Sequence, residues 1–166
     1  NFVLAELKTE QGRLLRSYAA GEAKLNAYLD DYAFLVSGMI ALHRATGDEQ
    51  WLQAAAALTD KQIELFADEQ SGGFFFTSSD HPTLIVRVKD PVDSAIPSGM
   101  SVTAENLAYL AASEKASPVY ETQLKSTLKS IAPLLRRASS AAPRSAAAMA
   151  NYLEKLPPPA LRIPQP

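Results

Sequence analysis

The first half of the chain carries its most regular pattern of hydrophobic and polar positions. From Leu29 to about Ala45, apolar residues recur with a helical period on a wide stripe, which predicts a helix buried over most of its girth. From about Glu49 to Phe66, apolar side chains fall on one side and charged ones on the other, which predicts a more exposed, amphipathic helix. Gly47 suits a left-handed helix end and Asp48 an N-cap, so the two segments are expected to form an antiparallel hairpin.

The second half of the chain repeats this arrangement. A helix is expected over about 101–113, a partner helix over about 117–131, and an alanine-rich helix over about 144–156. Pro133 is expected to kink or restart the partner helix. A shift of 69 positions superimposes the same order of buried helix, turn, capping residue and outer helix. The sequence therefore predicts an all-α fold built from repeated antiparallel helical hairpins.

Short β inserts are expected between the helices. Residues 74–77 and 84–88 are typical of two short strands, and the polar turn between them favours pairing as a β-hairpin. Residues 12–18 predict a short strand or an extended loop. Residues 2–7 resemble the end of a helix and the first residue is not Met, so we expect the chain to be the C-terminal piece of a longer protein.

Composition excludes several classes of function. The 166 residues are 47% hydrophobic and 20% charged with a net charge of −2, and no segment concentrates Lys or Arg as a nucleic-acid binder would. No apolar run approaches the ~20 residues that cross a bilayer and no signal-peptide pattern opens the chain, so we expect no membrane contact and a cytoplasmic location. The absence of cysteine excludes disulfides, zinc–thiolate sites and thiol catalysis within this chain.

A pair of carboxylates marks the start of the most buried predicted helix. Asp30 and Asp31 precede Tyr32 there, and either carboxylate suits the N-terminal end of a helix, where it caps N–H groups and interacts favourably with the helix dipole. The alternative is a functional one, in which a carboxylate is a polar group at the mouth of a pocket where several inner helices begin. The residues alone leave both interpretations open.

The segment 89–101 is dense in Asp, Ser, Pro and Gly and leads into another buried helix. It is either a rigid loop with Ser98 or Ser101 as N-cap, or a substrate loop in which Asp93 and backbone N–H groups face a ligand. One turn further along, Glu105 is either paired with an arginine or lines a cavity.

Basic residues flank the same loop, and histidines lie elsewhere. Arg87 and Lys89 are expected to pair with the nearby aspartates. We interpret His43, late in a buried helix, as a hydrogen-bonded packing residue, and His81, in a polar turn, as solvated. Two isolated histidines without matching carboxylates do not indicate a metal site. The run 74–76 of three phenylalanines is more typical of a core than of a sugar-stacking platform.

Four motifs together are more specific than any one of them. Leu-Asp-Asp-Tyr-Ala-Phe-Leu at 29–35, Ala-Thr-Gly-Asp at 45–48, Gly-Gly-Phe-Phe-Phe-Thr at 72–77 and Asp-Ser-Ala-Ile-Pro-Ser-Gly at 93–99 resemble the YyaL-like family, also described as similar to spermatogenesis-associated protein 20. The resemblance covers roughly residues 11–113 well.

The resemblance implies a thioredoxin-like domain followed by a six-hairpin α/α toroid, similar to N-acylglucosamine 2-epimerases and several glycosidases. Residues 1–156 would then be part of the toroid, and 157–166 a proline-rich extended tail. The thioredoxin-like region would lie outside this chain and be its partner. A partial toroid is also expected to expose apolar flanks of the helices at 29–45 and 101–113, and hence to self-associate.

Toroid relatives bind carbohydrate at one end of their inner helices, so the resemblance also implies site residues. Those expected to act in catalysis are Asp31, Asp93 and Glu105. Those expected to bind substrate are Asp30, Tyr32, Arg16, Arg87 and Ser98. No metal or cofactor is implied.

Two functions remain open at this stage. The first is a carbohydrate-binding or carbohydrate-active toroid, which requires the acidic side chains to converge on one cavity. The second is a non-catalytic helical-hairpin scaffold for another protein or domain, in which the same carboxylates cap helices or form closed ion pairs.

Overall fold

The computed structural model describes residues 2–81, 85–113 and 116–154. Its elements, in chain order, are α1 (Phe2–Glu6), β1 (Leu15–Ala19), β2 (Glu22–Asn26), α2 (Leu29–Thr46), α3 (Glu49–Phe66), α4 (Gly99–Ala111), α5 (Pro118–Arg137), the 3-10 helix η1 (Ser139–Ala141) and α6 (Pro143–Glu154). The predicted all-α class with short β inserts is confirmed. The tail predicted at 157–166 lies outside the described residues.

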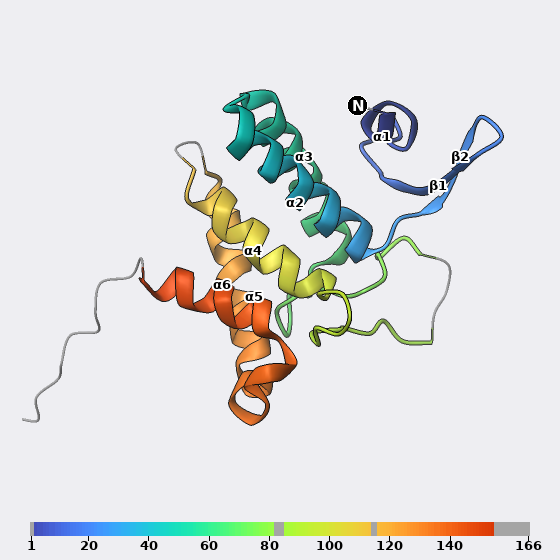
Figure 1. Cartoon of the computed structure of the whole chain (residues 1–166). Coiled ribbons are helices and arrows are strands. Elements are labelled where there is room, and N and C mark those ends of the chain that lie inside the picture. The colour runs from blue at the N-terminus through green and yellow to red at the C-terminus, as the bar shows by residue number, and fades with distance from the viewer. Residues whose placement is uncertain (1, 82–84, 114–115, 155–166) are drawn as a thin grey trace, which may run out of the picture.

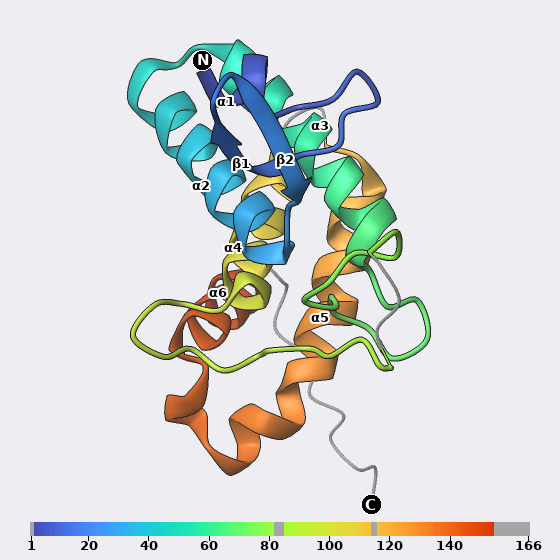
Figure 2. The ribbon, with the colours of Figure 1, turned by 90° about the vertical axis from the view of Figure 1, so that its right-hand side faces the viewer.

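The five long helices form two layers. Helices α2, α4 and α6 lie side by side, and α4 packs against both of the others (Figure 1). Helix α3 packs on α2, and α5 packs on α4, so these two form the second layer (Figure 2). The predicted pair of helical hairpins, α2–α3 and α4–α5, is therefore confirmed.

Local capping explains where the helices begin and end. Gly47, with φ of 70°, ends α2 in the left-handed conformation, and the Asp48 side chain accepts the Gln50 N–H at the start of α3. Ser117 caps α5 in the same way. Helix α5 then continues to Arg137 with Pro133 inside it, so it does not restart at that proline.

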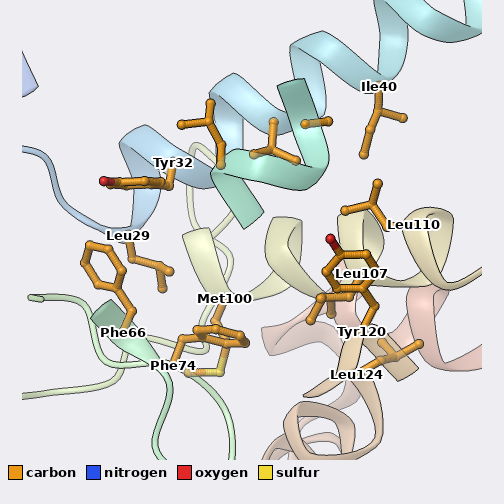
Figure 3. Packing of buried hydrophobic residues seen from close by; sticks show 14 of the residues in the cluster. Leu29, Tyr32, Ile40, Phe66, Phe74, Met100, Leu107, Leu110, Tyr120 and Leu124 are labelled. Atoms are coloured by element: carbon orange, nitrogen blue, oxygen red, sulfur yellow. The ribbon is translucent and has the colours of Figure 1, made fainter. Parts of the chain in front are cut away.

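The core lies between the two layers (Figure 3). Its largest fully buried side chains include Leu29, Tyr32, Phe66, Phe74, Met100, Leu107, Leu110 and Leu124. Burial of each such side chain contributes about 1.5–3 kcal/mol. The phenylalanine run is only partly core, because Phe74 is buried whereas Phe75 and Phe76 are half-buried.

The burial predicted for the two inner helices, α2 and α4, differs from the burial that the structure shows. The prediction that α2 is buried over most of its girth is wrong, because Phe34 and Leu42 on one face are 37% and 43% exposed. The predicted exposed flank on α4 is wrong as well: none of its large hydrophobic side chains is exposed, because α2 and α6 cover both sides.

The short strand or loop predicted over 12–18 is confirmed in part, because β1 covers Leu15–Ala19, whereas its partner β2 was not predicted. Strands β1 and β2 pair antiparallel, with Leu15 opposite Asn26, around a turn at Ala20 and Gly21 where both φ angles are positive. The expected hairpin between 74–77 and 84–88 does not form in the part that the structure describes. There the two runs are joined by one backbone hydrogen bond, from the Phe76 N–H to the Val88 carbonyl, and by the Arg87 guanidinium, which donates to the Thr77 carbonyl. Leu84 lies outside the described residues.

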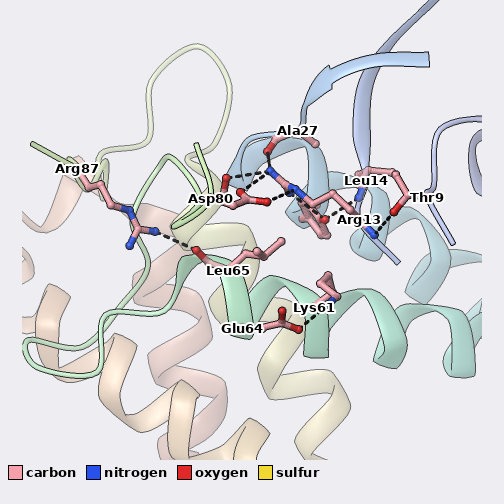
Figure 4. Close-up of polar contacts among 11 residues, drawn as sticks. Thr9, Arg13, Leu14, Ala27, Lys61, Glu64, Leu65, Asp80 and Arg87 are labelled. Carbon is pink, nitrogen blue, oxygen red and sulfur yellow. Dashed lines mark hydrogen bonds and ion pairs between the residues drawn. The ribbon is translucent and has the colours of Figure 1, made fainter. Parts of the chain in front are cut away.

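A buried arginine ties the β-hairpin region to the helices (Figure 4). Arg13 is 9% exposed, and its guanidinium donates to the hydroxyls of Tyr32 and Ser78 and forms an ion pair with Asp80 at 3.0 Å. These contacts join the segment before β1 to α2 and to the loop after α3. They position the N-terminal end of α2, where three of the eight predicted site residues lie, Asp30, Asp31 and Tyr32.

Candidate functional site

Asp31 caps its own helix. Its Oδ2 accepts the backbone N–H of Tyr28 at 2.8 Å and lies 3.5 Å from Nη1 of Arg16. The Arg16 guanidinium also lies over the Tyr28 ring, 4.8 Å from the ring centre. The capping interpretation of Asp31 is therefore confirmed, and two predicted site residues, Arg16 and Asp31, lie together at this helix end.

Asp30 joins the starts of two inner helices. Its carboxylate accepts a hydrogen bond from the backbone N–H of Gly99, the first residue of α4. Burial raises the pKa of Asp30 above its ordinary value of 3.8, and the hydrogen bond from Gly99 opposes that rise. The carboxylate is thus held against α4, in an interaction between N-terminal helix ends.

Asp93 connects the starts of α4 and α6 in a similar way. Its Oδ1 accepts the Ser98 N–H at 2.9 Å, and its Oδ2 accepts the Arg144 N–H at 3.0 Å, in the first turn of α6. Ser98 is the N-cap of α4, and hydroxyl contacts continue from it through Ser101 to Ser145 on α6. The loop before α4 therefore caps this helix through Ser98, which agrees with the interpretation of segment 89–101 as a rigid loop with an N-cap.

Arg87 lies at the carboxyl end of α3. It donates to the carbonyl of Leu65 (Figure 4). It also donates to the carbonyl of Thr77 and lies over the Phe75 ring at 4.2 Å. Burial lowers the pKa of its guanidinium. The predicted pairing of the two basic residues with nearby loop aspartates is wrong, because Arg87 binds these carbonyls and Lys89 forms its ion pair with Asp68 at 2.6 Å.

Tyr32 is a core residue. Its side chain is fully buried, and its hydroxyl accepts the Leu14 N–H at 2.7 Å and a hydrogen bond from Arg13 at 3.2 Å. The hydroxyl is thus engaged inside the protein, on the side of α2 that faces the chain before β1.

An aromatic group that the sequence did not indicate lies beside the Asp31 cap. The ring of Tyr28 stacks on Phe76 and on His81, each at a centroid distance of 5.1 Å. The prediction that His81 is solvated is wrong, since it is half-buried in this stack. The three rings come from separate segments, and so no local pattern connects them.

A cleft lies at the other ends of the inner helices. It has a volume of about 1350 Å³ and is lined by the carboxyl-terminal halves of α2 and α4, the first turns of α3 and α5, and α6. Of the eight predicted site residues, only Glu105 lines it. The structure therefore does not bring the predicted carboxylates into one cavity.

Glu105 forms a forked ion pair across the cleft wall. Its two carboxylate oxygens lie 3.0 Å and 2.6 Å from Nε and Nη2 of Arg144. Both side chains are partly exposed, so the pair presents a charged, planar hydrogen-bonding surface to the cleft. Both alternatives for Glu105 are therefore true, since it is paired with an arginine and also lines a cavity.

A second polar group of the cleft was missed by sequence reasoning. Nδ1 of His43 lies 2.9 Å from the hydroxyl of Tyr109, and Nε2 lies 3.3 Å from Glu49. His43 is hydrogen-bonded, as interpreted, but it also lines the cleft. The pair with Tyr109 spans 66 positions in the chain, so only the packing of α2 on α4 creates it.

Two further classes of site, metal centres and membrane spans, are absent from the described ranges. No group of three or more His, Asp or Glu side chains there lies close enough to hold a metal ion. Among the helices that the structure describes, none is long and apolar enough to span a membrane.

The chain is homologous to spermatogenesis-associated protein 20 over about half its length. It is 43% identical to the human and rat proteins of that name over 81 residues, which are 48% of this chain and 10% of each relative. An uncharacterized protein of Caenorhabditis elegans is 28% identical over 87 residues, 52% of this chain and 12% of that protein. The matched part thus spans about a tenth of the length of these relatives. No protein-family model matches the chain.

Proposed function

We propose that this chain is part of an α/α-hairpin toroid that binds a carbohydrate in the cleft between α2, α4 and α6. The two-layer packing of repeated hairpins supports the toroid. The similarity to spermatogenesis-associated protein 20 over a small share of that protein supports a longer chain, in which a thioredoxin-like region and further hairpins would complete the domain. In that longer protein, this chain supplies one wall of the cleft.

The observation that carries the proposal is the lining of the cleft. The Glu105–Arg144 fork lies in it together with amide side chains and two tyrosines, Tyr109 and Tyr120. Sugar hydroxyls both donate and accept hydrogen bonds. The planar carboxylate, guanidinium and amide groups supply acceptors and donors for them. Tyrosine rings add apolar surface with a polar tip. A volume of about 1350 Å³ holds an oligosaccharide.

The proposal is for binding, and it does not assign catalysis to Asp31 and Asp93. Acid–base chemistry on a glycosidic bond uses two carboxyl groups that flank one sugar ring. Asp31 and Asp93 instead accept backbone N–H groups at helix starts, away from the cleft that Glu105 lines.

The test is a titration of the full chain with maltotetraose, followed by ¹H–¹⁵N NMR. We expect saturable shifts that concentrate on cleft residues and a weaker affinity in Glu105→Gln. Glu121→Gln is the matched control, because Glu121 also forms an ion pair, with Lys125 at 2.8 Å, but does not line the cleft. Equal loss in both variants, or no saturable shift with this or other neutral oligosaccharides, contradicts the proposal.

A scaffold is the second candidate, and the capping carboxylates favour it. Asp30 and Asp93 each connect the starts of two neighbouring helices, which is a structural use of a carboxylate. A scaffold is expected to bind the thioredoxin-like region of the longer protein. Calorimetric titration of that region into this chain tests it, and binding that survives Glu105→Gln separates it from sugar binding.

A further inference from the structure

Glu49, His43 and Tyr109 form a hydrogen-bonded series at one end of the cleft. We propose that the Tyr109 hydroxyl binds a ligand hydroxyl there, and that the protonation of His43 decides whether Tyr109 accepts or donates that hydrogen bond. The ligand class is the neutral saccharide of the proposed function, on which this inference rests. Tyr109 would be the ligand-contacting residue, and His43 and Glu49 would position it.

Three helices fix the geometry of the series. His43 comes from α2, Glu49 from the first turn of α3 and Tyr109 from α4. The imidazole is held at both nitrogens, 2.9 Å from the Tyr109 hydroxyl and 3.3 Å from a Glu49 oxygen, and its ring lies edge-on to the tyrosine ring at 76°. Its side chain is only 18% exposed. A ring held in this way has a defined orientation.

The partners define the tautomer of a neutral His43. A carboxylate only accepts hydrogen bonds, so the nitrogen that faces Glu49, Nε2, carries the proton. Nδ1 is then an acceptor, and the Tyr109 hydroxyl donates its proton to it. With its proton engaged, the tyrosine oxygen has lone pairs left to accept a hydrogen bond from the cleft. Neutral His43 therefore makes Tyr109 an acceptor toward the ligand.

Protonation of His43 reverses this polarity. Both ring nitrogens then donate, so the Tyr109 oxygen accepts from Nδ1 and its own proton turns toward the cleft. A sugar hydroxyl that donated to Tyr109 must rotate its proton elsewhere. Because an imidazole as a class can change charge between pH 5 and 8, we expect saccharide affinity to depend on pH across that range.

Other charged groups also line the cleft near this series. Besides Glu49 of the series itself, they are Arg44 on α2, Glu105 on α4, and Arg144 and Glu154 on α6. A pH effect that requires both His43 and Tyr109 therefore reports on this series.

The first test needs no ligand. The chain has two histidines, so ¹⁵N NMR of the imidazoles resolves His43 once His43→Gln assigns the signals. We expect the Nε2–H tautomer at neutral pH and a perturbed Nδ1 signal in Tyr109→Phe. An Nδ1–H tautomer overturns the inference, whatever any sugar titration gives.

The second test uses maltotetraose affinity across pH 5 to 8. Tyr109→Phe is expected to weaken binding roughly two- to tenfold at neutral pH, the equivalent of one neutral hydrogen bond, and to flatten the pH profile, as is His43→Gln. Tyr152→Phe is the control, because its hydroxyl binds Glu121 outside the cleft lining. If Glu105→Gln weakens binding but Tyr109→Phe leaves affinity and pH profile unchanged, the proposed function stands and this inference fails.

Discussion

The carboxylate of Asp30, in the first turn of α2, accepts a hydrogen bond from the backbone N–H of Gly99, the first residue of α4. The two helix starts approach so closely that a Cβ atom on Gly99 would clash with Asp30 Oδ1 and lie 3.1 Å from the backbone Cα and N of Asp30. Glycine at position 99 thus permits both the hydrogen bond and the close packing of the two inner helices.

Replacement of this glycine by alanine is expected to destabilise the fold. Gly99→Ala places a methyl group against the α2 backbone, and relief of that contact requires a shift that costs about 1–3 kcal/mol. Gly38→Ala is the control, since Gly38 lies inside α2 and its added Cβ meets nothing within 4 Å, so a gain of about 0.5–1 kcal/mol is expected. Urea denaturation measures both. Equal stability of Gly99→Ala and the unchanged protein would show that the helices adjust freely.

The buried charge of Asp30 is expected to make stability depend on pH. Its pKa is raised in the folded state, so the folded protein binds this proton more tightly than the unfolded chain does. The contribution of Asp30 to stability is therefore largest at acidic pH and falls as the pH rises above 3.8, through the raised folded-state value.

Asp30→Asn keeps an oxygen that can accept the Gly99 N–H but carries no charge. It is expected to be at least as stable as the unchanged protein at pH 7 and to lose this part of the pH dependence, whereas Asp30→Ala loses the cap and about 1 kcal/mol. Thermal unfolding from pH 4 to pH 7 measures this. A destabilised Asp30→Asn at pH 7 would mean that the negative charge itself stabilises the α4 start.

A buried side-chain hydrogen bond is expected to hold α3 against α4. Gln62 and Thr103 are each 1% exposed, and the amide of Gln62 donates to the Thr103 hydroxyl at 2.6 Å. Thr103→Val keeps the shape but leaves the amide unsatisfied, at a cost of about 1–3 kcal/mol. Thr122→Val is the matched control, because that exposed hydroxyl only bonds back to the Pro118 carbonyl, and a change within about 0.5 kcal/mol is expected. Chemical denaturation that ranks the two variants equally would contradict the role of Gln62.

The exposed face of α2 is expected to promote self-association. Phe34 and Leu42 lie on it with the exposed small residues Gly38, Ala41 and Ala45 between and beyond them. The double variant Phe34→Ser, Leu42→Ser is expected to remain monomeric at concentrations where the unchanged chain dimerises. Val119→Ser, which removes a comparably exposed side chain from α5, serves as the control. Analytical ultracentrifugation decides the point, and a monomeric unchanged chain at high concentration would contradict the expectation.

Local sequence was sufficient to predict the helical hairpins. Apolar periodicity, the Gly47–Asp48 stop and start, and Ser98 and Ser117 as caps act between residues a few positions apart, so their physical effect can be derived without a fold. The strand β2 was missed because Glu22–Asn26 is polar and pairs through its backbone. The turn at Ala20 and Gly21, rather than a hydrophobic pattern, brings it back along β1.

The use of the polar side chains was decided only by tertiary structure. The sequence placed Asp30 and Asp93 near helix starts and Glu105 one turn further along, but a carboxylate satisfies a neighbouring helix as readily as a ligand. Which of the two it does depends on what packs within 3 Å of it. Because α2 packs closely on α4, the Asp30 carboxylate contacts the Gly99 N–H. Because α6 packs on α4, Asp93 and Glu105 bind Arg144.

The cleft also depends partly on local sequence and partly on tertiary packing. The sequence predicted α2 and α4 as two separate buried helices, with His43 late in the first of them. It did not determine that His43 and Tyr109 meet, because contact between residues 66 positions apart depends on the angle and register at which two helices pack. Periodicity fixes the face of a helix, whereas the shape of the whole core fixes which faces meet.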